Sequence, residues 1–143
     1  MGTAARSRPV RIACVAAAAA AVHPVAVLVF VYAHLFASGL PGGRHGPADA
    51  YRHSLASAVV AYTLHPRCVD WVTAVMERDG RGSAARAMDA HNNRLGARIG
   101  AAAASISAMR RAIADAVANG EAHAASHDRI TWLAPDAWQE RLY

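Results

Sequence analysis

Two short polar stretches stand out in a chain that is 55% hydrophobic. One reads Asp49-Ala-Tyr-Arg-His53, and the other reads Met88-Asp-Ala-His-Asn-Asn-Arg-Leu-Gly96. A buried carboxylate, imidazole or amide that lacks a partner costs about 1–3 kcal/mol. A chain that keeps several such groups together is therefore building either a hydrogen-bonded network or a site for acid–base chemistry.

Helical spacing decides which side chains of the second stretch can act together. Four residues recur at intervals of three and four and share one helix face: Asp89, Asn92, Asn93 and Gly96. His91 lies about 200° around the helix from Asp89 and points elsewhere. The small residues of the shared face also allow another backbone to approach closely.

The first stretch offers a matching helical surface. His53 shares a face with Ala56 and Ser57, and Arg52 lies at the border of that face. We expect His53 to lie opposite Asp89 or Asn92.

Each polar residue has a functional and a structural interpretation. His53 is a candidate general base or metal ligand, and Asp89 could hold it in one tautomer, as the carboxylate does in hydrolase triads. Asn92 could orient a substrate or an oxyanion, and Glu77 is a fourth candidate catalytic residue. The candidate binding residues are Arg52, His91, Asn93 and Gly96. Alternatively, Asp89 pairs with Arg52 and the asparagines satisfy backbone groups at a helix crossing.

Other catalytic signatures are missing from the sequence. It contains no nucleophile elbow, Walker loop, Rossmann glycine pattern or HExxH motif. His123 and His127 are four residues apart, but no third ligand lies within sequence reach, so no metal site is predicted and the cofactor stays unknown. An enzyme built from these residues would be a His/Asp or His/Glu hydrolase.

The two stretches also carry a resemblance to a known family. An Arg-His pair followed by Met-Asp-x-His-Asn-Asn-x-x-Gly resembles a bacterial family of uncharacterised helical domains that recurs in secreted and toxin-associated proteins. The resemblance spans about residues 48–100, and Glu77 falls where that family has a glutamate. The chain departs from the pattern at Ala56, where the family tends to have Trp, and at Met76, where it tends to have His. The resemblance implies a helical fold and a shared polar cluster, and it supplies no reaction.

The N-terminal region is long and apolar enough to cross a membrane. No Asp, Glu, Lys or Arg occurs from Ile12 to Gly43. Residues 12–37 would form a helix about 39 Å long, against a hydrocarbon core of about 30 Å. Because Pro24 divides this stretch, we expect one kinked or tilted span, an uncleaved signal anchor.

A cleaved signal peptide is the competing interpretation. Arg6, Arg8 and Arg11 form a basic segment ahead of the apolar stretch, and Ala37-Ser-Gly39 is the best cleavage triplet. The apolar stretch exceeds the usual signal core of about 7–15 residues. The positive-inside rule predicts a single-pass inner-membrane protein with residues 1–11 in the cytoplasm and the C-terminal domain in the periplasm.

Charge argues against nucleic-acid binding. The formal net charge is +5, from fifteen basic and ten acidic residues. Three of the arginines precede the span, so twelve arginines face ten acids in the rest of the chain, a balance of +2. These arginines are scattered along the chain, and no phosphate-binding stripe is predicted.

The remaining sequence predicts an all-α domain. Residues 38–47 read as a Gly/Pro-rich linker, and residues 48–143 as a small extracytoplasmic helical bundle. We expect helices over about 47–64, 66–78 and 84–118, the last one long with a single buried stripe. A short last helix is expected near Trp138, and no strand is predicted.

Three functions fit these observations. The first is a subunit or assembly factor of the bacterial envelope, anchored in membrane lipid and bound to an envelope protein or to peptidoglycan. The second is an envelope-directed hydrolase or toxin-like enzyme that uses the His/Asp/Asn cluster. The third is a phage-type lysis protein, suggested by the weakly apolar, Ala-rich anchor.

Overall fold

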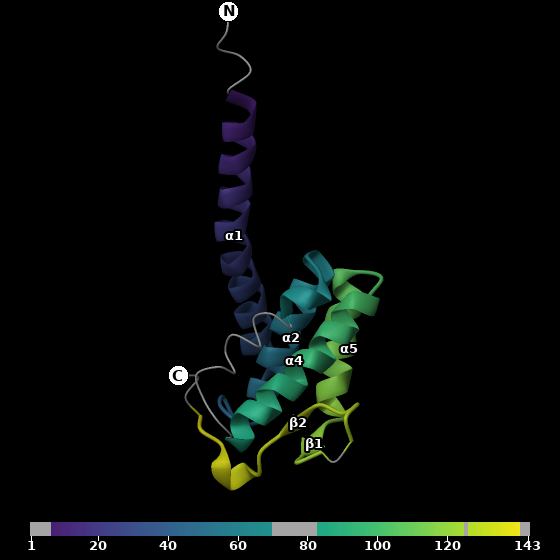
Figure 1. Ribbon diagram of the computed structural model, residues 1–143. Coiled ribbons are helices and arrows are strands. Elements are labelled where there is room, and N and C mark those ends of the chain that lie inside the picture. The colour runs from purple at the N-terminus through teal and green to yellow at the C-terminus, as the bar shows by residue number, and fades with distance from the viewer. Residues whose placement is uncertain (1–6, 70–82, 125, 141–143) are drawn as a thin grey trace, which may run out of the picture.

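The computed structural model describes residues 7–69, 83–124 and 126–140. Its elements in chain order are α1 (Ser7–Ser38), α2 (Pro47–Thr63), α4 (Ala84–Ala102), α5 (Ile106–Ala118), β1 (Glu121–Ala122), β2 (Thr131–Trp132) and the 3-10 helix η1 (Pro135–Ala137). Figure 1 shows α1 extending beyond a small group of helices, with the strands and η1 at the opposite end. The predicted helical fold with one N-terminal helix of membrane-spanning length is confirmed.

Helix α2 is the centre of the fold. It begins with Pro47 in its first turn, where the missing proline N–H costs nothing, and it ends at Thr63, one residue before the predicted end. It contacts α1, α4 and α5. Leu55 and Ala58 on α2 are fully buried because neighbouring helices cover both of these positions. The predicted next helix begins at Pro66, and its continuation, with Glu77, lies outside the described residues.

One face of α1 belongs to the hydrophobic core. Val27, Val31 and Leu35, spaced by four residues, are buried in the same cluster as Leu55. Burying each such side chain contributes about 1.5–3 kcal/mol. From the sequence, we expected this helix to be a membrane span separate from the C-terminal domain. In the structure, its C-terminal half is part of the domain core.

The long helix expected over residues 84–118 is divided into α4 and α5. Ala103 ends α4 with extended backbone angles, and the Ser105 hydroxyl accepts a hydrogen bond from the Ala108 N–H to cap α5. Serine at this position stabilises a new helix start. As a result the expected buried stripe is interrupted, and Ile106 is exposed while Met109 and Ile113 are buried.

The C-terminal tail contains two short strands that the sequence did not predict. Strands β1 and β2 pair in parallel, with Glu121 opposite Thr131. The expected last helix is reduced to η1, and the Trp138 indole N–H donates to the Leu133 carbonyl at 2.7 Å. A two-residue strand has no periodicity to detect, so only the tertiary contacts define it.

Helices α2 and α4 cross at van der Waals contact. A Cβ atom added to Gly96 would lie 2.1 Å from the Ser54 carbonyl oxygen, and one added to Gly100 would lie 2.2 Å from that of Ala58. Only glycine permits this approach. The small-residue strip that the sequence assigned to this face is therefore the crossing point of the two helices, and it holds His53 beside Asp89.

Candidate functional site

Asp49 is the buried carboxylate of the polar cluster. It lies in the first turn of α2, and only 3% of its side chain is exposed. Its Oδ2 accepts a hydrogen bond from the His45 N–H at 2.7 Å, and its Oδ1 accepts one from the Arg52 guanidinium. A carboxylate near a helix N-terminus that also bonds a preceding N–H fixes the start of the helix.

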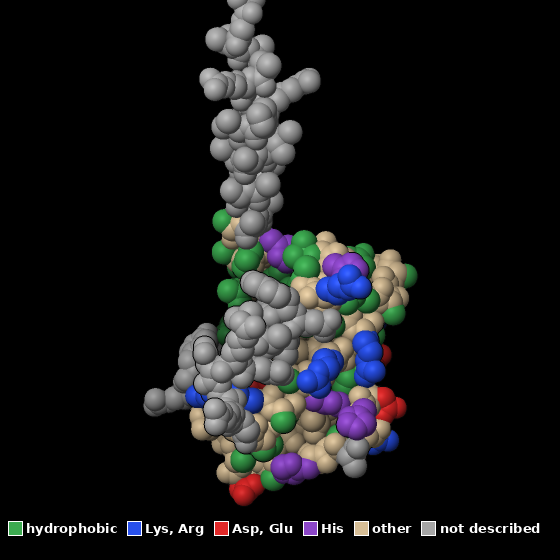
Figure 2. Space-filling model, viewed as in Figure 1, with side chains coloured by type: hydrophobic (Ala, Val, Ile, Leu, Met, Phe, Trp, Pro, Cys, Tyr) green, Lys and Arg blue, Asp and Glu red, His purple; other side chains and the backbone are tan. Residues whose placement is uncertain are grey.

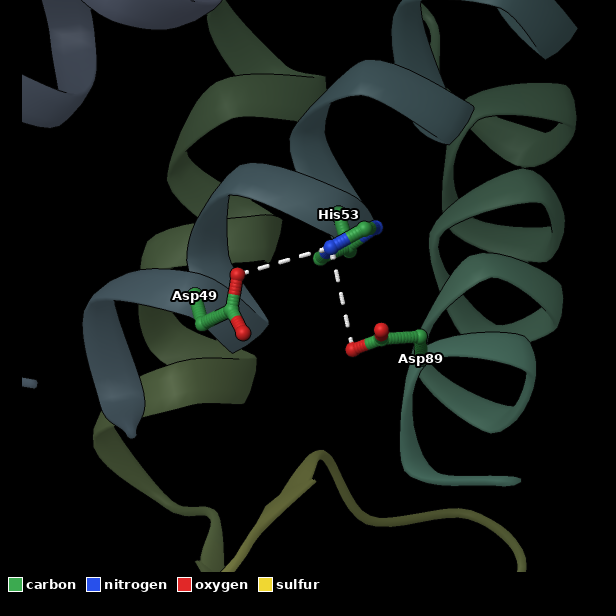
Figure 3. A group of neighbouring side chains, drawn as sticks. All are labelled: Asp49, His53 and Asp89. Carbon is green, nitrogen blue, oxygen red and sulfur yellow. Dashed lines mark ion pairs between the residues drawn. The ribbon is translucent and has the colours of Figure 1, made fainter. Parts of the chain in front are cut away.

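His53 lies between two carboxylates from different helices (Figure 3). Its Nε2 is 3.4 Å from Asp49 Oδ1, one turn earlier on α2, and 3.7 Å from Asp89 Oδ1 on α4. The prediction that His53 would face Asp89 or Asn92 is thus met by Asp89. We call Asp49, His53 and Asp89 the triad.

Arg52 adds a fixed positive charge to this cluster. Its Nη2 lies 3.4 Å from His53 Nε2 and also donates to Asp49 Oδ1. The structural interpretation paired Arg52 with Asp89, whereas the structure places the guanidinium against Asp49. The ion pair keeps Asp49 charged in a buried position.

The two carboxyl groups have pKa values shifted in opposite directions. Burial raises the pKa of Asp49, but the hydrogen bonds from His53 and His45, together with the charges of His53 and Arg52, outweigh it, so the net pKa lies below 3.8. For Asp89, burial is also the largest cause and raises the pKa above 3.8, the charge of His53 opposing it and that of Asp49 adding to it. Asp49 therefore loses its proton more readily than an ordinary aspartate, and Asp89 takes one up more readily.

Asp89 is the least satisfied member of the triad. Its Oδ1 is inaccessible to solvent and receives no hydrogen bond from any residue that the structure describes. Its side chain as a whole is 28% exposed, and that of His53 is 26% exposed, so both can be reached from solution. A buried carboxylate oxygen without a hydrogen-bond donor lowers the stability of the fold. Such groups are characteristic of sites that bind a ligand or perform chemistry.

Asn92 has a structural role in this fold. Its Nδ2 donates to the Thr131 carbonyl at 2.7 Å, and its Oδ1 accepts from the Thr131 N–H at 3.0 Å. The side chain is fully buried. Both amide atoms hold strand β2 against α4. The Asn92 side chain therefore does not point toward His53, as had been expected from the sequence.

We expect Asn92→Leu to lower the free energy of unfolding by about 2–4 kcal/mol, because it leaves the Thr131 N–H and carbonyl buried without the amide. Chemical denaturation followed by circular dichroism measures the change. Asn119→Leu is the matched control, since that amide bonds one exposed carbonyl of its own helix. Equal stability of the two variants would contradict the role given to Asn92.

The remaining candidate residues are distributed around the triad. Asn93 accepts a hydrogen bond from the Ser57 hydroxyl at 2.9 Å across the α2–α4 crossing. The His91 ring is 2.7 Å from the Arg129 carbonyl, on a different side of α4 from Asp89, as the helical spacing predicted. Gly96 forms the crossing itself. Glu77 lies outside the described residues.

Asp49 belongs to the site, although from the sequence it was expected only as part of the first polar stretch, with no role in the site. The spacing of three to Arg52 and four to His53 was visible and indicates contact on a helix. Asp49, His53 and Asp89 each offer one ligand atom, and these atoms lie within 4.8 Å of one another, although no metal site was predicted.

A comparison with protein families identifies the chain. Residues 4–124 match a family described as a domain of unknown function, DUF6973, and the chain belongs to this family. The match includes α1 and every member of the triad, and it ends before β2. No curated protein and no solved structure matches the chain significantly.

Proposed function

We propose that this DUF6973 domain is a membrane-anchored hydrolase of the bacterial envelope in which the triad performs acid–base catalysis. The observation that carries the proposal is the position of His53, whose Nε2 lies 3.4 and 3.7 Å from two carboxylates with oppositely shifted pKa values. Pairs of titratable groups whose environments separate their pKa values are typical of acid–base sites.

The triad residues have distinct roles in this proposal. Asp49 stays ionised and stabilises the imidazolium form of His53, as the buried aspartate does in a hydrolase triad. Among the described residues, His53 makes polar contacts with Asp49, Arg52 and Asp89, none of which is a hydroxyl or thiol nucleophile. Water is therefore the proposed nucleophile.

The proposed reaction is hydrolysis of an ester, amide or phosphoester bond. His53 accepts a proton from water as the oxygen attacks, and the bond to the leaving group then breaks. His53 then passes this same proton to the leaving group, which restores the neutral imidazole. Asp89, which binds a proton more readily than an ordinary aspartate, faces the protonated imidazole from the side of α4. Apart from the substrate, the reaction consumes only water.

An anchored, outward-facing position is part of the proposal. The basic N-terminal segment favours a cytoplasmic N-terminus and a periplasmic domain. Cleavage near Ala37 would remove Val27, Val31 and Leu35 from the core, which supports a retained anchor. The family match starts at residue 4 and includes α1, which supports a helix retained with the domain. The resemblance to domains of secreted and toxin-associated proteins supports an outward-facing position. Peptidoglycan, lipid and envelope proteins are then the accessible substrate classes.

The proposal is tested with the full chain in lipid nanodiscs. Wild type is assayed against peptidoglycan, phospholipid vesicles and a chromogenic ester. We expect His53→Gln to lower the hydrolytic rate by about 10²–10⁴-fold, the usual contribution of a general base. His127→Gln, a change of an exposed histidine outside the triad, should retain the wild-type rate. Equal rates for the two variants, or no hydrolysis of any substrate, would overturn the proposal.

A divalent-cation centre is the second candidate. A tetrahedral zinc ion with bonds of about 2.0–2.1 Å holds its ligand atoms about 3.3–3.4 Å apart, close to the separations of His53 Nε2 from the two carboxylates. The Arg52 guanidinium on Asp49 Oδ1 competes with such an ion, which favours acid–base catalysis. Zinc titration distinguishes the two, because a cation centre predicts a raised melting temperature that Asp89→Asn removes.

The role of an envelope assembly factor fits the triad less well. That role predicts a polar cluster whose members are all satisfied internally, whereas Asp89 Oδ1 has no donor in the part of the chain that the structure describes. A phage-type lysis protein would require the anchor to leave the membrane, and the anchor's buried face opposes this.

A further inference from the structure

The end of the domain from which α1 emerges carries exposed apolar side chains. Of the large hydrophobic residues that the structure shows as exposed, all but Phe36 lie on α1 between Val22 and Val29 or at the adjoining ends of α2 and α5. We define the collar as Val22, Val25, Leu28, Tyr62, Leu64 and Ile106. Figure 2 shows hydrophobic side chains gathered at this end, below the grey part of α1.

An apolar groove runs through the collar. It has a volume of about 660 Å³ and lies between α1 and the end of α2. Pro24, Val27 and Leu28 line one side, and Val60 and Leu64 line the other. Exposed apolar surface of this kind marks a contact with a partner or a membrane.

The length of α1 indicates that this contact is with a membrane and not with a protein partner. The part of α1 that extends beyond the collar, from Ser7 to Val22, is about 24 Å long. Its charge-free part begins only at Ile12 and is about 16 Å long. A membrane span needs about 20 apolar residues, so a span that starts at Ile12 reaches Val31. Val31 is already buried within the domain.

The polar groups of the collar suit an apolar environment. The His23 ring lies 2.8 Å from the Thr63 hydroxyl, which donates in turn to the Val59 carbonyl at 2.7 Å. Polar groups at membrane depth require such internal partners. Residues 50–69 contain no acid, and the exposed Arg67 lines the groove with the charge that anionic headgroups attract.

We propose that the collar is embedded in the leaflet next to the domain, with phospholipid acyl chains in the groove and Arg67 at the headgroups. The inference rests on the membrane anchoring proposed above and is independent of the triad chemistry. An amphipathic surface of this kind enters the headgroup and acyl boundary by about 5–10 Å. The domain then stands directly on the bilayer instead of being held away from it by the 38–47 segment.

The experiment measures the depth of single labels in the full chain. In a Cys14→Ser, Cys68→Ser background, three variants are reconstituted in vesicles of phosphatidylcholine and phosphatidylglycerol: Val22→Cys, Leu64→Cys and Ala137→Cys. Each carries the fluorophore NBD, and lipids with doxyl groups on their acyl chains quench it. Residue 137 is exposed in η1 at the opposite end of the domain and serves as the control.

We expect quenching at positions 22 and 64 to be at least about twofold stronger than at 137. Quenching at 22 with a signal at 64 equal to that at 137 would show an anchored chain whose collar is out of the lipid, which overturns the inference alone. Signals at 22 and 64 both equal to that at 137 would overturn the anchoring as well. Hydrolysis by the triad is assayed separately, so its failure is distinguishable from both.

Discussion

Gly96→Ala is expected to lower the free energy of unfolding by about 3 kcal/mol or more. The added methyl group would lie 2.1 Å from the Ser54 carbonyl oxygen and 2.8 Å from the Ser54 Cα. Backbone atoms in the middle of a helix cannot rotate away as a flexible side chain can, so α2 and α4 must separate. Separation would open the core around Leu55 and move Asp89 away from His53.

Denaturant unfolding of the wild type and the variant measures the loss. Ala101→Ser is the matched control, because it also adds one heavy atom to α4 but at an exposed position. Its stability should lie within about 0.5 kcal/mol of wild type. A Gly96→Ala protein as stable as this control would mean that the close crossing of α2 and α4 is incorrect.

Asp49→Asn is expected to destabilise the domain by about 3–5 kcal/mol, the usual effect of removing one partner of a buried ion pair. The neutral amide would no longer offset the charge of the Arg52 guanidinium, and the Arg52 side chain is only 18% exposed. An amide oxygen can still accept the His45 N–H, so the loss isolates the contribution of the charge. Asp89→Asn should be neutral or stabilising, because the buried Asp89 Oδ1 has no donor to lose among the described residues.

A change of pH should alter the contributions of Asp49 and Asp89 to the free energy of unfolding in opposite directions. The pKa of Asp49 in the folded state lies below 3.8, so its stabilisation is complete above 3.8 and is lost as pH falls through that lowered pKa. The pKa of Asp89 in the folded state lies above 3.8, so its contribution is complete below 3.8 and is lost as pH rises through that raised pKa.

Stability measured between about pH 3 and pH 8 tests these signs. The stability advantage of wild type over Asp49→Asn should grow as pH rises toward 3.8 and stay constant at higher pH. Relative to Asp89→Asn, the wild type should instead lose stability as pH rises above 3.8. Parallel curves for the two variants would indicate that the carboxylates share one environment. The distinct acid–base roles given to them would then be incorrect.

The sequence by itself determined the helical fold and much of its organisation. The charge-free stretch from Ile12 to Gly43 specified one long apolar helix, because a helix satisfies its own backbone groups in a membrane or a core. Pro47 and Asp49 set the start of α2, since both suit a first helical turn. These are local effects, and local effects can be read from neighbouring residues.

The sequence also limited the residues opposite His53 to Asp89 or Asn92. Residues spaced by three and four share a helix face, and the small Gly96 marked the face that another helix approaches. Two helical faces, each with one small-residue strip, have few ways to cross closely. This limited choice left Asp89 and Asn92 as alternatives, and the structure places Asp89 beside His53.

Only the tertiary structure decided how each polar group is partnered. Asn92 lies on the predicted face, but its amide binds Thr131, 39 residues later in the chain, and nothing local to either residue indicates this contact. Arg52 could reach either aspartate, and the packing of α2 placed it on Asp49. The same packing left Asp89 Oδ1 without a donor from the described residues, and this oxygen supports the proposed site.

The structure also decided which part of α1, a helix that the sequence assigned to the membrane, is packed in the domain core. Composition cannot separate these states, because lipid and a protein interior favour the same apolar side chains. Val27, Val31 and Leu35 became core residues only because other parts of the domain pack beside them. Local sequence determines which segments form helices and which faces of those helices are apolar or polar. Which faces pack against each other depends on contacts between residues far apart in the chain, and these leave no signal in the local sequence.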